Sequence, residues 1–169
     1  MSCSCGTAPP SATRPTPIHS TSLTSASSAT STTRGKELAK AFGEAIRAAH
    51  LPIGEVYTSQ FNRAYETAVL AGFTDIKTTA DLTEGGLVVT PDEDNRRAQA
   101  LRDMLAAAPV PGKSRVLITH KPNIVDALGK DWFDVREGEA SIFRPDGGKY
   151  RLVARVQMDD WPMIAAAAQ

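Results

Sequence analysis

Three side chains of this sequence could act together on an anion: Arg63, Glu84 and His120. Each follows a segment that the local pattern predicts to be a strand. Arg63 stands where the strand EVYTS meets the next helix, Glu84 lies in the loop after a second strand, and His120 ends the strand RVLIT. Because ligands bind outside the carboxyl ends of parallel strands, the pattern predicts one crevice that contains all three side chains.

The chemistry expected of such a crevice is phosphate or carboxylate chemistry. An arginine at a helix N-terminus adds a rigid fork of donors to the free backbone N–H groups there. A carboxylic acid held nearby can donate a proton to a leaving oxygen, and a cationic histidine can share the charge of the anion.

Each of the three residues also has a simpler explanation. Arg63 can pair with Glu66 on the surface of its helix, Glu84 can be a solvated loop acid, and His120 can be the cap of a strand end. Any one of these explanations suffices for its own residue. Three such residues at the same edge of one sheet favour a site.

The elements that must position these side chains alternate along the chain. Apolar residues recur at helical spacing in some segments, and short β-branched or alternating runs predict strands in others. The expected helices are 35–50, 62–72, 94–107, 124–128 and 161–168, and the expected strands are 55–59, 76–79, 116–119, 139–144 and 150–156. The last two strands form a β-hairpin. The sequence therefore predicts an α/β fold, with a mainly parallel sheet flanked by helices on both faces and a C-terminal hairpin.

Composition limits the partners. The chain has 169 residues, enough for one domain, and 19 basic residues balance 19 acidic ones, so no strong field points to nucleic acid. No apolar run reaches the roughly 18 residues of a membrane span. Cys3 and Cys5 both lie at the extreme N-terminus, which leaves the folded part without an internal disulfide or a cysteine metal site.

The first 33 residues differ from the rest. Ser, Thr, Ala and Pro dominate, acidic residues are absent, and the sizeable aliphatics are Ile18 and Leu23. Such a segment buries too little surface to offset its ordering entropy, so we expect residues 1–33 to be disordered and residues 34–169 to form the domain. An apolar signal-peptide core is missing as well, and a cytoplasmic location is expected.

The order of these motifs resembles the histidine phosphatase superfamily, with its phosphoglycerate mutase-like fold. VYTSQFNRAYETA is similar to the family pattern Ser-Pro-x-x-Arg-Ala-x-x-Thr-Ala through Ser59, Arg63, Ala64, Thr67 and Ala68. RGKELAKAFGEAI precedes it, DLTEGG and LITHKPNI follow, and GEASIFRPDGGKYRLVARVQMDDW is similar to the closing hairpin of the small bacterial branch.

The resemblance implies a phosphomonoester hydrolase that acts through a phosphohistidine and needs no metal or other cofactor. Arg63 and His120 would hold the phosphoryl oxygens, and Glu84 would protonate the leaving alcohol. Asn123 would shape the loop after His120 and belong to the phosphate-binding residues. The implied partner is a small phosphomonoester or phosphate itself.

One part of the family pattern is missing. The nucleophile of the family belongs to an Arg-His-Gly triplet after the first strand, and this chain contains no such triplet. His50 follows a helix that ends at the opposite edge of the sheet, and His19 lacks the flanking Arg and Gly. We therefore also expect the first strand to be absent, which leaves an unpaired edge inside the sheet. A non-catalytic phosphate-binding remnant is the alternative function, and a flavodoxin-like binding domain is a third possibility.

Overall fold

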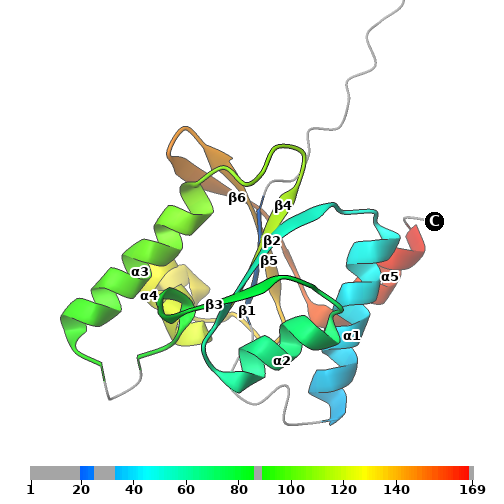
Figure 1. The fold of residues 1–169 in the computed structure, drawn as a ribbon, viewed down its shortest axis with the longest axis horizontal. Helices are drawn as coiled ribbons and strands as arrows, with labels where there is room; N and C mark the ends of the chain where they lie inside the picture. Colours follow the sequence, from blue (N-terminus) through cyan, green and yellow to red (C-terminus); the bar gives the residue numbers. More distant parts are fainter. Residues whose placement is uncertain (1–19, 25–32, 86–88, 168–169) are drawn as a thin grey trace, which may run out of the picture.

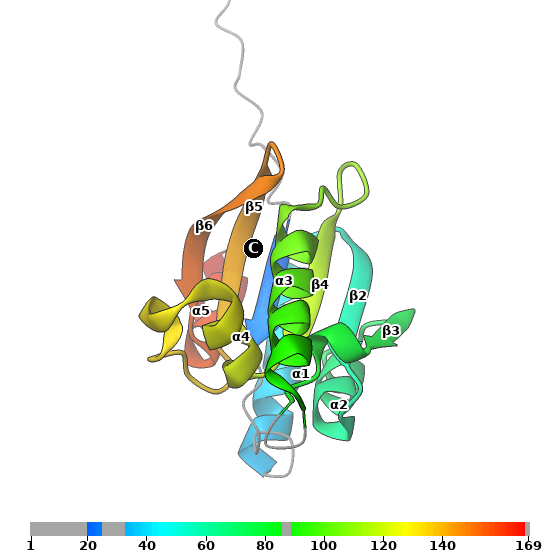
Figure 2. The same cartoon turned by 90° about the vertical axis from the view of Figure 1, so that its left-hand side faces the viewer.

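The computed structural model describes residues 20–24, 33–85 and 89–167. A six-stranded sheet runs through the centre in the order β3-β2-β4-β1-β5-β6. Figure 2 shows the strands in this order, from β3 on the right to β6 on the left. The strands are β1 (Ser20–Thr24), β2 (Ile53–Ser59), β3 (Ile76–Thr79), β4 (Ser114–Thr119), β5 (Ala140–Asp146) and β6 (Lys149–Val156).

The sheet is mainly parallel, as the sequence predicts. The strands β1, β4, β2 and β3 are parallel to one another, whereas β5 pairs antiparallel with β1 and β6 pairs antiparallel with β5. The α/β class and the C-terminal hairpin are thereby confirmed. A flavodoxin-like sheet is parallel throughout with the strand order 2-1-3-4-5, so that alternative is wrong.

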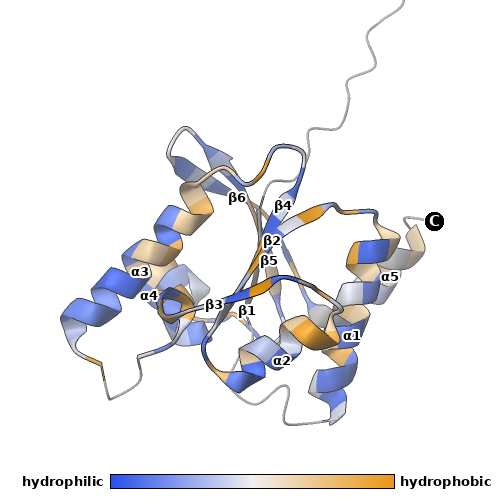
Figure 3. Cartoon of the chain, in the orientation of Figure 1, coloured by the Kyte–Doolittle hydropathy of each residue, from blue (hydrophilic) through white to orange (hydrophobic). Residues whose placement is uncertain are grey.

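Helices cover both faces of the sheet (Figure 1). The α-helices are α1 (Thr33–Ala48), α2 (Asn62–Leu70), α3 (Pro91–Ala106), α4 (Lys121–Leu128) and α5 (Trp161–Ala167), and short 3-10 helices lie at η2 (Ala80–Leu82), η4 (Lys130–Trp132) and η5 (Met158–Asp160). One apolar core joins α1, α2 and α5 to the sheet, and a second core joins α3 and α4 to its other face. In Figure 3 the amino-terminal half of α3 is strongly hydrophilic, which fits its exposed position.

The strand β1 corrects the expectation that the first strand is absent. It lies in the middle of the sheet, where Thr24 pairs with Thr119 of β4 and Leu23 pairs with Ala140 of β5. The sequence STSLT has little apolar character, but Thr suits extended backbone, and two neighbouring strands offer a full set of backbone partners. The interior edge is therefore paired. Disorder stays a prediction for 1–19 and 25–32, which lie outside the described residues.

In the described ranges, no helix combines the length and the apolar character that a bilayer-spanning segment requires.

Candidate active site

Arg63, Glu84 and His120 meet at the carboxyl edge of the sheet. His120 directly follows β4, Arg63 lies in the first turn of α2 after β2, and Glu84 follows η2. The guanidinium of Arg63 pairs with the Glu84 carboxylate through Nη2, and its Nε and Nη2 lie 3.3 Å and 3.1 Å from Nδ1 of His120. We call these three residues the Arg–Glu–His cluster.

The simpler explanations for the three residues do not fit these contacts. Glu66 pairs with Lys36 at 3.3 Å, while Arg63 turns toward Glu84. The Glu84 side chain is only 20% exposed, so it is not a freely solvated acid. His120 is the N-cap residue of α4, but its side chain makes no capping hydrogen bond.

The hydrogen bonds of His120 define its protonation in this structure. An arginine side chain can only donate, so Nδ1 of His120 must accept from Arg63. The ring proton then resides on Nε2, which lies 2.6 Å from Oγ of Ser59 and donates to it. His120 is fully buried. The cationic role that the sequence suggested for it stays a prediction.

Ser59 and His120 resemble a serine–histidine pair, but the orientation is wrong for a serine nucleophile. In such a pair Nε2 must accept the serine proton while Nδ1 donates to a carboxylate. Here Nδ1 faces the donors of Arg63, and Oγ of Ser59 also accepts from the backbone N–H of Phe61 at 3.1 Å. Ser59 therefore fixes the ring of His120 and is not activated by it.

Phe61 is a member of the site that the sequence did not reveal. Its ring centroid lies 5.2 Å from that of His120, and the guanidinium carbon of Arg63 lies 4.8 Å from the same ring. The signal was present in VYTSQFNRAYETA, where an aromatic residue stands between the motif positions Ser59 and Arg63.

The segment before Glu84 is fixed by hydrogen bonds from neighbouring elements. Oγ1 of Thr119 donates to the carbonyl of Leu82 at 2.8 Å, and Nη1 of Arg97 in α3 donates to the carbonyl of Thr83 at 2.8 Å. Oγ1 of Thr83 accepts from the backbone N–H of Gln60 at 2.9 Å, next to the start of α2. These bonds hold the glutamate at a defined position beside Arg63.

Asn123 lies two residues into α4 and is 5% exposed. Its Nδ2 has no hydrogen-bond partner among the described residues. The structure thus places Asn123 one helical turn from His120 with a free donor, and the role that the resemblance implies for it stays a prediction.

The two other histidines do not join the cluster. His50 is exposed and lies two residues after the end of α1 and three residues before the start of β2, at the amino edge of the sheet. His19 lies outside the described residues. Its neighbour Ser20 pairs with Arg115, at the opposite end of β1 from the Thr24–Thr119 pair.

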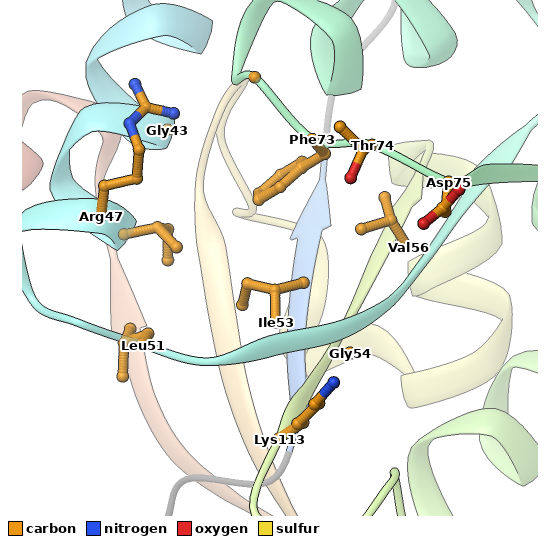
Figure 4. Close-up of a pocket in the computed structure, with 12 residues that line it drawn as sticks. Gly43, Arg47, Leu51, Ile53, Gly54, Val56, Phe73, Thr74, Asp75 and Lys113 are labelled. Atoms are coloured by element: carbon orange, nitrogen blue, oxygen red, sulfur yellow. The ribbon is translucent and has the colours of Figure 1, made fainter.

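A separate hollow of about 370 Å³ opens at the amino edge of the sheet, between α1, the start of β2 and the α2–β3 loop. Figure 4 shows Phe73 and Ile53 in its middle, with Arg47 and Lys113 on different sides. Arg47 already donates to the carbonyl of Ala71 at 2.9 Å. This hollow contains no member of the Arg–Glu–His cluster, and the described residues include no group of three side chains suited to hold a metal ion.

Comparison with known proteins agrees with this arrangement. The model of the histidine phosphatase superfamily (branch 1) matches residues 30–112. A sequence search against curated proteins finds no match.

Solved structures share the fold at low sequence identity. A phosphoserine phosphatase from Entamoeba histolytica, solved in complex with 3-phosphoglyceric acid, is 13% identical with a TM-score of 0.59, over 82% of this chain and 98% of that one. The product of Mycobacterium tuberculosis open reading frame Rv3214 is 17% identical with a TM-score of 0.57, over 80% and 96%. A phosphoglycerate mutase from Plasmodium falciparum is 15% identical with a TM-score of 0.56, over 80% and 89%. The phosphoglycerate mutase-like fold is thereby confirmed.

Proposed function

This chain belongs to the histidine phosphatase superfamily, and from that premise we propose that its Arg–Glu–His cluster binds the phosphoryl group of a small phosphomonoester. The observation that carries the proposal is the position of the Arg63 guanidinium, which lies between a carboxylate and a buried histidine. The even balance of 19 basic and 19 acidic residues gives no reason to extend the partner to nucleic acid.

The hydrogen-bond donors of Arg63 and His120 indicate how a phosphoryl group would bind. The Glu84 carboxylate now accepts from Nη2 of Arg63, and the same planar fork also suits phosphoryl oxygens. A second phosphoryl oxygen would accept the Nε2–H of His120 after the imidazole ring rotates away from Ser59. The positive charge at the phosphoryl group would come from the protein itself.

Hydrolysis through a phosphohistidine would need one more residue. A neutral imidazole would attack phosphorus, the alcohol would leave with a proton from Glu84, and water would then release phosphate. The residues that follow Thr24 in the sequence are Ser25 and Ala26, and no histidine occurs between His19 and His50.

The lack of a histidine directly after β1 favours the second candidate, a non-catalytic phosphate-binding protein of the same fold. Thr24 pairs with Thr119, the residue before His120, so β1 ends beside the cluster. A nucleophilic histidine belongs at this point of the sequence, and its absence removes the attacking group while Arg63 and His120 keep the donors.

Two measurements on the same protein separate the candidates. Hydrolysis of p-nitrophenyl phosphate is followed for the wild type, His120→Ala and His19→Ala, and binding of inorganic phosphate is measured by calorimetry. Phosphate binding that is weakened in His120→Ala, without hydrolysis in the wild type, supports the non-catalytic candidate. Hydrolysis that is lost in His19→Ala identifies a nucleophile and supports the enzyme. Absence of both hydrolysis and phosphate binding refutes the proposed function.

A further inference from the structure

Phe61 presents an exposed aromatic ring at the edge of the Arg–Glu–His cluster, and we propose that this ring selects phosphomonoesters whose alcohol is aromatic. The inference rests on the proposed function, because it concerns the part of the ligand that extends from the phosphoryl group. It assigns Phe61 as a specificity-determining residue.

The first support is the contrast in exposure between neighbours. Phe61 is 37% exposed, although its ring packs on His120, which is fully buried. A large apolar side chain that stays partly in water beside a polar cluster leaves surface that a ligand can cover, and covering it is favourable.

The second support is the distance from the anion-binding donor. The guanidinium carbon of Arg63 lies 4.8 Å from the ring centroid. A phosphoryl oxygen on Arg63 would lie about 2.7–2.9 Å from the donor nitrogen. The first carbon of a phosphate ester is only two bonds from phosphorus, so an aryl group on it comes within the roughly 4.5–7 Å that separates the centroids of interacting rings.

The third support is that the other aromatic side chains nearby are engaged elsewhere. Trp132 is buried against Phe143 with ring centroids 5.5 Å apart, so it packs against strand β5 of the hairpin. Phe133 is 71% exposed and faces Nζ of Lys121 at 5.2 Å. Phe61 contacts both Arg63 and His120.

The test compares two ligands that carry the same charged head group and cannot be hydrolysed. Dissociation constants of methylphosphonate and phenylphosphonate are measured by calorimetry for the wild type, Phe61→Ala and Phe61→Leu. Val69→Ala is the matched control, since Val69 is 49% exposed on the last turn of α2, away from the cluster.

We expect the wild type and Val69→Ala to bind phenylphosphonate about tenfold more tightly than methylphosphonate. In Phe61→Ala the preference falls to about twofold or less, and Phe61→Leu, which keeps apolar bulk, lies between the two. A phenyl preference that is absent in the wild type, or that persists in both Phe61 variants, overturns the inference while leaving phosphoryl binding intact. Failure of the wild type to bind either ligand overturns the proposed function, and this inference with it.

Discussion

Arg63 donates to Nδ1 of His120 from two nitrogens, at 3.3 Å and 3.1 Å, and so determines which side of the imidazole carries the proton. The proton on Nε2 is directed at Ser59 in a closed interior, where an unpaired donor is costly. The arginine that is proposed to bind the anion therefore also orients the histidine beside it.

Removal of the Ser59 hydroxyl is expected to destabilise the fold. Ser59→Ala leaves the buried Nε2–H of His120 without its acceptor, and we expect the free energy of unfolding to fall by about 1–3 kcal/mol. Denaturant titration measures this. Ser141→Ala is the matched control, because Ser141 is equally buried but its Oγ has no partner among the described residues. Equal losses for the two variants would contradict the account of Ser59.

Glu84→Gln is expected to strengthen the binding of inorganic phosphate. The carboxylate competes with phosphate for Nη2 of Arg63 and repels the incoming anion. The neutral amide of glutamine still offers a carbonyl oxygen to Arg63, but it accepts more weakly and does not repel the anion. We expect affinity to rise by about threefold to tenfold, as for the loss of a like-charge contact of roughly 1 kcal/mol. Weaker binding to Glu84→Gln in calorimetry would show that the carboxylate supports the anion and does not compete with it.

The sequence located the site better than it located the strand at its centre. His120 follows a strand with a strong apolar pattern, whereas Arg63 and Glu84 follow short strands that are recognised by their alternation with helices. The parallel topology of these strands brings all three residues to one edge. The sequence STSLT of β1 has almost no apolar pattern, so it did not predict a strand. Backbone pairing with β4 on one side and β5 on the other favours the extended conformation there.

The side-chain contacts within the site could not be predicted from the sequence, for a different reason. The Ser59–His120 bond joins residues 61 positions apart, and the role of Phe61 depends on how the ring turns at the start of α2. Neither a distance of 2.6 Å nor the direction of a side chain follows from periodicity. The sequence pattern likewise does not show that Arg63 pairs with Glu84 instead of Glu66.

Acid is expected to weaken the attachment of α3 to the segment that carries Glu84. Hydrogen bonds from Arg96 and then Arg97 lower the pKa of Glu93 from 4.5 to about 2, and Arg97 also holds the carbonyl of Thr83. A lowered pKa in the folded state stabilises the fold above the ordinary value, and this contribution is lost as the pH falls from about 4.5 toward 2.

The effect of Glu93 can be measured from the slope of the melting temperature against pH. Between pH 4.5 and pH 2.5 the melting temperature should fall more steeply for the wild type than for Glu93→Gln, which has no carboxylate to protonate. Glu37→Gln, at an exposed position of α1, should keep the slope of the wild type. Parallel curves for the wild type and Glu93→Gln would refute the role of this carboxylate.

Glu139 is expected to hold the hairpin to the segment before it. Its fully buried carboxylate accepts from Nη2 of Arg155 in β6 at 3.1 Å and from Nε2 of Gln157, directly after β6, at 2.7 Å. Glu139→Ala should lower the free energy of unfolding by about 3 kcal/mol, because Arg155 loses its buried partner.

The matched control uses the other carboxylate on the same arginine. Asp134 accepts from Arg155 at 3.0 Å, but its side chain is 75% exposed. Asp134→Ala should therefore change the free energy of unfolding by only about 0–1 kcal/mol in the same denaturant titration. If Asp134→Ala lowers the free energy of unfolding as much as Glu139→Ala does, burial does not determine the strength of the two ion pairs of Arg155.

Calorimetric titration of inorganic phosphate into the wild type, Arg63→Gln and Arg47→Gln is the most direct test of the central claim. Arg47 is the matched control, since it lies beside the hollow at the opposite edge of the sheet. The account predicts binding that is weakened at least about tenfold in Arg63→Gln, from the loss of a charged hydrogen-bond donor, and unchanged in Arg47→Gln. Phosphate binding that survives in Arg63→Gln but is lost in Arg47→Gln would contradict the account and place the anion site in that hollow.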